Sequence, residues 1–136
     1  MSENKVSFEG RTVIITGAAR GIGAATARLV ASRGGKVFAL DIAKDGLASL
    51  KSELGLPDEQ VIPLDLGNQA SVKETIDSIF AKAGRIDALI NTAGIVGPTN
   101  VKVEDVKWED FETTLRINLF GTVWLTQAVR SEERRV

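Results

Sequence analysis

A glycine-rich stretch between an apolar run and a helical pattern constrains the fold of this chain most. Residues 12–15 read T-V-I-I, residues 16–23 read T-G-A-A-R-G-I-G, and a helical pattern follows. Glycines allow close backbone approach to a ligand, and the free N–H groups at a helix start attract negative charge. This order predicts a phosphate-binding site. The spacing G-x-x-x-G-x-G differs from G-x-G-x-x-G, so the stretch alone is equally compatible with a surface turn before an ordinary helix.

The whole chain alternates predicted strands with predicted helices. Strands are expected at residues 11–16, 36–41, 60–64 and 86–91, and helices at residues 21–33, 44–54, 69–83 and 105–130. This alternation predicts one α/β domain over residues 1–136, with a parallel sheet between two helical layers. Pro63 cannot donate a ladder hydrogen bond, so the third strand should be an edge, which agrees with the order 3-2-1-4 expected of a doubly wound sheet. The first two helices should cover one face, and the last two the other.

Apolar spacing predicts which sides of the helices are buried. The expected core positions are Ile22, Ala25, Leu29 and Val30 in the first helix, Leu47, Leu50 and Leu54 in the second, and Val72, Ile76, Ile79, Phe80 and Ala83 in the third. Asn68 is the expected N-cap of the third helix, and Gly84 its end. The last helix is apolar on two sides, with Trp108, Phe111, Leu115 and Leu119 on one and Ile117, Phe120 and Trp124 on the other. Such a helix should be buried.

Composition excludes several function classes. The sequence of 136 residues contains no cysteine and no histidine, which removes thiol chemistry, Ser-His-Asp catalysis and the commonest metal ligands, so no metal site is expected. Lysine and arginine (17) nearly balance aspartate and glutamate (18), which argues against nucleic acid and anionic membranes as partners. The start, Met1 to Lys5, lacks a signal-peptide core and no run is long enough to span a bilayer, so we expect a cytoplasmic protein.

Asp41, at the end of the second strand, bears on which cofactor binds. In dinucleotide-binding folds, a carboxylate at the end of the second strand accepts hydrogen bonds from the adenosine ribose hydroxyls and repels a 2′-phosphate, so Asp41 predicts NAD rather than NADP. Arg20 argues the other way, because a cation beside the middle glycine can hold a 2′-phosphate. We give Asp41 more weight, since a carboxylate beside a phosphate is strongly unfavourable without a paired cation. The alternative is an aspartate that merely starts a turn.

Three further segments complete a family pattern. Asp65-Leu66 closes the third strand, N-T-A-G at residues 91–94 closes the fourth, and I-N-L-F-G at residues 117–121 lies in the last helix. Taken singly, Asp65 and N-T-A-G are also ordinary turn sequences, and an asparagine in a helix normally faces solvent. Together with the glycine motif, and over residues 11–129, the segments resemble the short-chain dehydrogenase/reductase family, with Thr92 in place of the motif's second asparagine.

The resemblance implies a Rossmann-type NAD(P) site and a role for each matched residue. Gly17, Ala19, Arg20, Gly21, Ile22 and Gly23 would form the phosphate loop. Asp65 would contact the adenine amino group, with the backbone of Leu66 assisting. Asn91 would join the fourth strand to the first, through Thr16, and the backbone of Ala93 and Gly94 would lie against the adenosine ribose. Asn118 would hold a water molecule in the proton relay to a catalytic lysine.

The resemblance also implies what this chain lacks. The family's catalytic serine and Y-x-x-x-K helix follow the fourth helix, near which this chain ends, and the sequence contains no tyrosine. We therefore expect the cofactor half of an alcohol or ketone oxidoreductase, inactive by itself. The alternative is a non-catalytic module that binds nucleotide or pairs with itself or full-length relatives. A homo-oligomer through the last helix or the open fourth strand is expected. The polar ending, residues 130–136, is compatible with a shifted reading frame, an alternative splice end, a polar terminus or a frayed helix.

Overall fold

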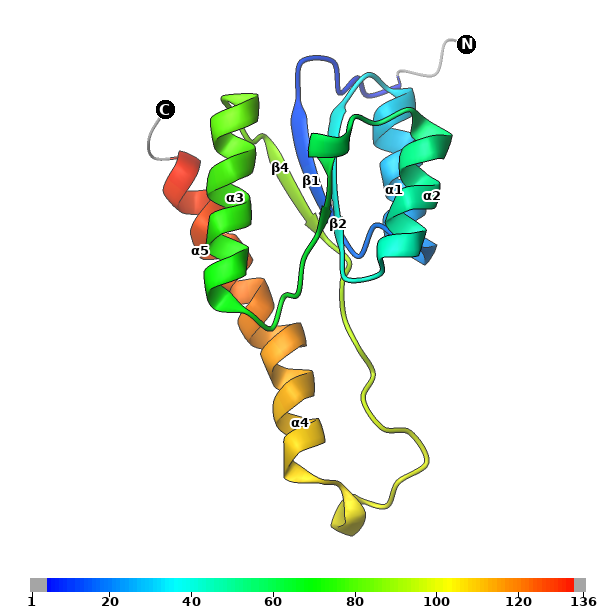
Figure 1. The fold of residues 1–136 in the computed structure, drawn as a ribbon, viewed down its shortest axis with the longest axis vertical. Coiled ribbons are helices and arrows are strands. Elements are labelled where there is room, and N and C mark those ends of the chain that lie inside the picture. Colours follow the sequence, from blue (N-terminus) through cyan, green and yellow to red (C-terminus); the bar gives the residue numbers. More distant parts are fainter. Residues whose placement is uncertain (1–4, 134–136) are drawn as a thin grey trace.

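The computed structural model describes residues 5–133 and places a parallel sheet between two layers of helices (Figure 1). The predicted α/β architecture is confirmed. The strands are β1 (Thr12–Thr16), β2 (Lys36–Asp41), β3 (Val61–Pro63) and β4 (Ala88–Asn91). The helices are α1 (Gly21–Ser32), α2 (Lys44–Leu54), α3 (Gln69–Ala83), α4 (Trp108–Leu115) and α5 (Gly121–Glu133), with 3₁₀ turns η1 (Asp58–Gln60) and η2 (Val103–Asp105) and a π-helical segment η3 (Arg116–Phe120).

The sheet has the order β3-β2-β1-β4, as predicted. β1 lies in the interior and pairs in parallel with β2 and β4. Pro63 is the last residue of the edge strand β3, opposite Asp41 of β2. A proline is tolerated there because the outer edge of β3 has no neighbouring strand within the described residues, and so needs no ladder donor.

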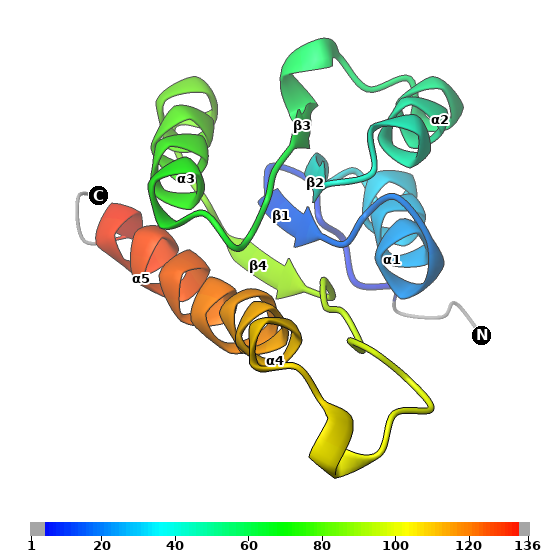
Figure 2. The same cartoon turned by 60° about the horizontal axis from the view of Figure 1, so that its bottom comes forward.

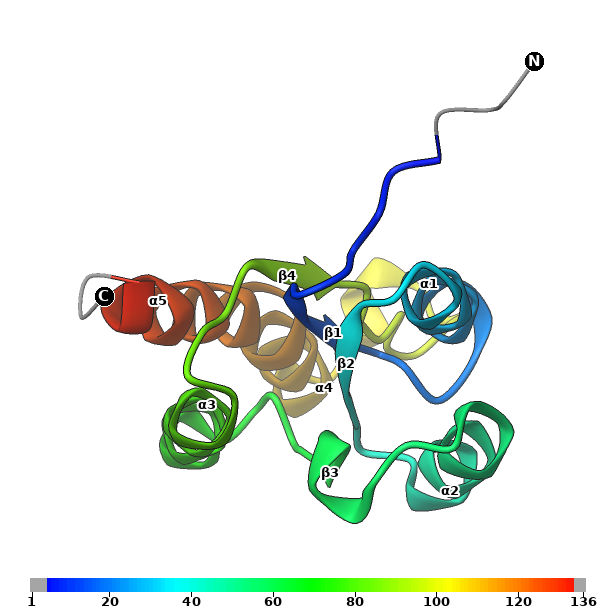
Figure 3. The same cartoon turned by 90° about the horizontal axis from the view of Figure 1, so that it is seen from above.

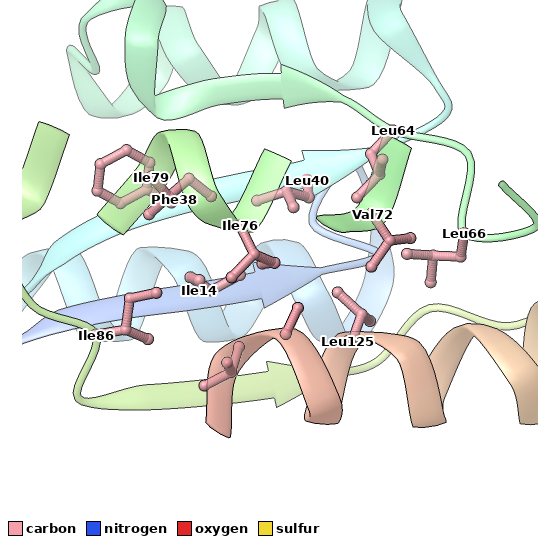
Figure 4. Close-up of a cluster of buried hydrophobic side chains, with 12 residues drawn as sticks. Ile14, Phe38, Leu40, Leu64, Leu66, Val72, Ile76, Ile79, Ile86 and Leu125 are labelled. Atoms are coloured by element: carbon pink, nitrogen blue, oxygen red, sulfur yellow. The ribbon is translucent and has the colours of Figure 1, made fainter. Parts of the chain in front are cut away.

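The sheet lies between two helical layers (Figure 3), and alternate residues of its central strands face opposite layers. Val13 and Ile15 pack in the cluster that includes α1 and α2, and Ile14 packs with α3 and α5. Figure 4 shows Phe38 and Leu40 of β2 in the second cluster, together with residues of α3 and with Leu125 of α5. The predicted division of the helices between the two faces is therefore confirmed, and it leaves the carboxyl ends of the strands open.

The predicted buried side of the first helix is wrong. Ile22 is 76% exposed and Leu29 is 48% exposed, and Ala25 is exposed as well. Of the predicted positions only Val30 is buried, and the face against the sheet is completed by Gly23, Ala24 and Ala27. Small residues let α1 approach the sheet closely, so the larger apolar side chains point outward. The predicted core positions of α2 and α3 are buried or half-buried in the structure.

The last helix differs from the prediction in its start and in its continuity. The expected helix over residues 105–130 begins at Trp108 and is divided by η3 into α4 and α5. The predicted burial is wrong for the first part of this helix, because none of the residues Trp108–Leu115 is buried, whereas Ile117 and Trp124 of the second predicted side are half-buried and pack against the core. In Figure 1 the preceding loop and α4 extend beyond the sheet, and α5 alone lies beside α3.

The remaining differences are at element ends. β3 and β4 are shorter than the predicted strands at residues 60–64 and 86–91. The predicted cap is confirmed, because Asn68 Oδ1 accepts from the Ser71 N–H at 3.0 Å. Within residues 5–133, no helix combines the length and apolarity that crossing a bilayer requires. The predictions for residues 1–4 and 134–136 lie outside the described residues.

Candidate functional site

A cleft of about 320 Å³ lies at the carboxyl ends of the strands, the end that faces forward in Figure 2. Ligand sites in open parallel sheets form at this edge, where neighbouring crossovers run to opposite faces. The cleft has the volume of an ordinary small-molecule site. It is lined by the turn after β1, the ends of β2 and β4, the segment after β3, and Ile117 of η3.

The glycine turn is pressed against the end of β4. A Cβ on Gly23 would lie 2.0 Å from the backbone oxygen of Gly17 and 2.7 Å from Thr92 Oγ1. A Cβ on Gly17 would lie 2.8 Å from the backbone nitrogen of Ala93, and its φ of +67° further favours glycine. Only glycine fits at these two positions, so the turn and the segment after β4 form one continuous wall.

The start of α1 faces the cleft with no acidic residue in its first turn. Gly21, Ile22 and Gly23 lie there, and the preceding Arg20 makes no side-chain capping bond to the helix. Helix N–H groups without a carboxylate cap, together with the positive end of the helix dipole, suit an anionic group. The exposed Arg20 lines the same cleft and adds a positive charge. The local geometry therefore fits a phosphate.

Asp41 connects the glycine turn to the end of β2. Its Oδ2 accepts from the Ala19 N–H at 3.0 Å, and its Oδ1 accepts from the Ala43 N–H at 2.9 Å. The bond to Ala43 is the turn contact expected of an aspartate, whereas the bond to Ala19 joins residues far apart in the chain. Each carboxylate oxygen retains a lone pair for a further donor. Asp41 is thus held in place, half-buried, with its charge at the cleft.

Asp65 and Leu66 bring the segment after β3 into the cleft. Asp65 is exposed, and its Oδ1 accepts from the Gly67 N–H at 2.8 Å, which is a local turn. Leu66 is buried in the core, and a Cβ on Gly121 would lie 2.8 Å from its backbone oxygen. Arg116 Nη1 donates to the Gly67 oxygen at 3.4 Å, so η3 also contacts this segment.

Asn91 points toward other elements of the protein. The Thr16 hydroxyl donates to Asn91 Oδ1, the contact between the first and fourth strands that the resemblance implied. Asn91 Nδ2 donates to Thr122 Oγ1 at 2.8 Å, a partner on α5. Thr92 Oγ1 donates to the Thr16 oxygen at 2.7 Å. These bonds join β1, β4 and α5 directly beneath the cleft.

Asn118 lies in the π-helical segment, a distortion that often occurs at functional sites. Both hydrogen bonds of its side-chain amide are made to the backbone of one residue, Ile95, in the loop after β4. Asn118 Oδ1 accepts from the Ile95 N–H at 2.8 Å, and Nδ2 donates to the Ile95 oxygen at 2.7 Å. The side chain is exposed and holds the loop against the helix. What its side chain does in the structure is therefore to position Ile95.

Most of the sequence-predicted site residues come together in this cleft. Those that line it are Gly17, Arg20, Gly21, Ile22, Gly23, Asp41, Asp65, Leu66, Ala93 and Gly94. Ala19, Asn91 and Asn118 are not among the described residues that line it, and the bonds given above occupy their polar groups. Lining residues to which the sequence analysis assigned no cofactor contact are Thr16, Leu40, Ile42, Leu64, Thr92, Ile95 and Ile117. Thr16, Leu40 and Thr92 lie at or next to the carboxyl ends of strands, and this position could have indicated that they line a ligand site. For Ile117, the only indication in the sequence was the neighbouring Asn118 of the family motif.

A strongly bound carboxylate lies at the opposite end of the sheet. Arg85 Nε donates to Asp87 at 2.9 Å, the Thr12 N–H donates at 2.7 Å, and Arg11 Nη1 donates at 3.2 Å. The hydrogen bond from Arg85 first, and then those from the Thr12 N–H and Arg11, together lower the pKa of Asp87 to about 2 against the effect of burial, which raises it. This cluster fastens the start of β1 and is a structural element.

Comparisons with known proteins agree with this geometry. A family model described as short chain dehydrogenase matches residues 11–135. The chain is 41% identical over 125 residues to the 3-oxoacyl-acyl-carrier-protein reductase of Thermotoga maritima, covering 90% of this chain and 50% of that protein. It is 37% identical over 124 residues to the D-threitol dehydrogenase of Mycolicibacterium smegmatis, covering 90% of this chain and 47% of that protein.

Solved structures give the same result. The short-chain dehydrogenase/reductase of Brucella melitensis superposes with a TM-score of 0.84 at 30% identity, over 94% of this chain and 52% of that chain. This chain therefore spans about half the length of the relatives it matches.

Proposed function

The chain belongs to the short-chain dehydrogenase/reductase family, and from this we propose that it binds a nicotinamide dinucleotide, NAD in preference to NADP, in the cleft at the carboxyl ends of its strands. The observation that carries this proposal is the cradle formed by Gly17, Gly21 and Gly23, where added Cβ atoms would clash or strain the backbone. The start of α1 and Arg20 supply positive charge for the pyrophosphate.

The preference for NAD rests on Asp41. Its carboxylate is held by two backbone N–H groups and lies at the cleft, where it can accept hydrogen bonds from ribose hydroxyls. A 2′-phosphate at that position would meet this negative charge. Arg20 is exposed, lines the same cleft and suits the pyrophosphate equally well. Asp65 and the backbone of Ala93 and Gly94 would hold the adenosine.

The test is a calorimetric titration of the folded chain with NADH and with NADPH. We expect saturable binding that is tighter for NADH. Asp41→Asn removes the charge at nearly constant shape and should shrink the preference for NADH roughly tenfold. Asp45→Asn, an exposed carboxyl in the first turn of α2, is the matched control and should change nothing. A folded chain that binds neither nucleotide would refute the proposal.

We propose that the 136-residue chain taken by itself is a cytoplasmic cofactor-binding unit that does not transfer hydride. Family chemistry needs a tyrosine as general acid/base, and the sequence has none. Incubation with NAD and simple secondary alcohols should give no rise in the absorbance of reduced nicotinamide, with a full-length family member as positive control. Turnover by the chain would contradict this.

A second function, as an interaction module, is favoured by the exposed apolar side chains of the last helical region. Trp108, Phe111, Leu119 and Phe120 are between 44% and 66% exposed. Apolar residues gathered in this way mark interaction sites. The partner we propose is a second copy of the chain, joined through α4 and η3 or through the open edge of β4. A monomeric mass by light scattering at micromolar concentration would contradict self-association.

A further inference from the structure

We propose that Thr122, in the first turn of α5, is a positioning residue that holds the end of β4 in its nucleotide-binding shape; this rests on the nucleotide site proposed above. Thr122 Oγ1 lies 2.8 Å from Asn91 Nδ2 and 2.8 Å from the backbone oxygen of Asn118. The single hydroxyl thus connects the strand to the π-helical segment. Thr122 lies just beyond the asparagine motif of the last helix and does not line the cleft.

Hydrogen-bond polarity shows that Thr122 determines how the Asn91 amide is turned. A carbonyl only accepts, so the Thr122 hydroxyl donates its one hydrogen to Asn118 and accepts from an N–H group. Asn91 must therefore present its amide nitrogen to Thr122 and its oxygen to the Thr16 hydroxyl. The reverse orientation would deprive the Asn118 carbonyl and the Thr16 hydroxyl hydrogen of these partners. The Thr122 hydroxyl thus fixes the orientation of the Asn91 side chain at the end of β4.

The same chain of bonds continues to the cleft wall. Thr16 Oγ1 accepts from the Ala93 N–H at 3.4 Å, and the Thr16 oxygen accepts from the Thr92 N–H at 3.3 Å and from Thr92 Oγ1 at 2.7 Å. Ala93 lines the cleft and lies against Gly17 of the phosphate turn. Polar networks of this kind are cooperative, so loss of one link weakens the others. Loosening at Thr122 should therefore reach Ala93.

The experiment compares substitutions at two threonines of α5, Thr122 and Thr126. Thr122→Val keeps the side-chain shape and removes the hydroxyl, and Thr122→Ser keeps the hydroxyl. Thr126→Val is the matched control, because Thr126 Oγ1 donates to the Thr122 oxygen at 2.8 Å, the same bond type one turn later. Amide hydrogen exchange of Thr92 and Ala93 is measured in the nucleotide-free chain, and NADH affinity by calorimetry.

We expect Thr122→Val to speed exchange at Thr92 and Ala93 and to weaken NADH binding, each about tenfold, which corresponds to the loss of one partly buried hydrogen bond. Thr122→Ser should restore both, and Thr126→Val should resemble the wild type. Should the valine variant not fold, Thr122→Ala is measured instead.

Unchanged exchange at Thr92 and Ala93 in a folded Thr122→Val chain would overturn the proposal. So would equal acceleration by Thr126→Val, since that would indicate general weakening of α5. Failure of the wild-type chain to bind NADH would refute the proposed function alone. The exchange rates, measured without nucleotide, would still decide whether Thr122 holds the strand end.

Discussion

At the scale of single residues, the three glycines of the phosphate turn are required for different physical reasons. Gly21 has a φ of +56° and open space around it, so its requirement is one of backbone conformation. Gly23 has no such φ, and its requirement is purely steric, because the Gly17 backbone occupies the place of a Cβ. Gly17 combines both reasons. The motif spacing located these residues, and only the packing distinguishes them.

The first prediction compares Gly23→Ala with Gly21→Ala. The added methyl at Gly23 would lie 2.0 Å from a backbone atom that cannot move freely, so we expect a loss of about 2–3 kcal/mol in the free energy of unfolding. At Gly21 nothing lies within 4 Å, and a loss of about 1 kcal/mol is expected from backbone strain alone. Urea unfolding of the two variants measures the difference, and equal losses would argue against the steric explanation.

The second prediction concerns Asp87 at the opposite end of the sheet. Its pKa is about 2 in the folded chain and 3.8 in the unfolded chain, because Arg85, Thr12 and Arg11 bond the carboxylate. A lowered folded pKa means that this stabilisation is complete above about pH 4 and is lost as the pH falls toward 2. After screening by solvent, the contribution is about 1–2 kcal/mol.

Urea unfolding at pH 7 and pH 3 checks this. The wild-type chain should lose part of the Asp87 contribution between these values, and Asp87→Asn should lose less than the wild type. Glu59→Gln, at an exposed carboxyl in η1, serves as the control. An identical pH dependence of the wild type and Asp87→Asn would contradict the assignment.

At the scale of elements, a local cap predicted the start of α3, whereas local apolar spacing mispredicted the buried face of α1. The start of α3 follows from Asn68 alone, because a capping side chain acts on an N–H three residues away. The buried face of α1 does not follow from local spacing, because it depends on how closely the helix packs against the sheet. Ala24 and Ala27 are buried at that contact, whereas Leu29 points away from it. The prediction from apolar spacing gave the larger side chains more weight than the alanines and therefore placed the buried face on the wrong side of α1.

The third prediction tests the cap of α3. Asn68→Ala removes the acceptor of the Ser71 N–H and should lower the free energy of unfolding by about 1 kcal/mol. Asn68→Asp keeps an acceptor oxygen beside the positive end of the helix and should stay within a few tenths of a kcal/mol of the wild type. Chemical denaturation followed by circular dichroism measures both. Equal destabilisation by alanine and aspartate would exclude capping as the cause.

At the scale of the whole molecule, the α/β body and the region around α4 differ in character. The body buries strand residues on both faces of the sheet between α1–α2 and α3–α5. α4 has no buried residue, and its Trp108 and Phe111 rings lie 5.4 Å apart at the surface. The apolar character that suggested burial from the sequence is therefore present without a covering layer from the described chain.

The fourth prediction follows from this surface. Trp108→Ser combined with Phe111→Ser should raise the dissociation constant of a self-associated species at least tenfold, because aromatic anchors dominate interface energies. The stability of the body should be unaffected, since both side chains are exposed. Lys107→Ser, a neighbouring exposed position, is the control. Light scattering across a concentration series measures the masses, and identical profiles for the wild type and the double variant would place any contact elsewhere.

The sequence by itself determined the alternation of strands and helices, the sheet order and the segments that form the cleft. Local rules supplied the elements, the edge position of the third strand and the cap before α3, whereas the doubly wound topology and the family resemblance supplied the sheet order and the segments of the cleft. The tertiary structure decided the outward face of α1, the interruption of the last helix at η3, and the bond from Asn91 to Thr122, whereas the contact of Asn91 with Thr16 was implied by the family resemblance. Thr16 and Asn91 are 75 positions apart in the chain, and Thr122 comes from a third element. Contacts between such distant segments depend on how the layers pack, which no local pattern contains.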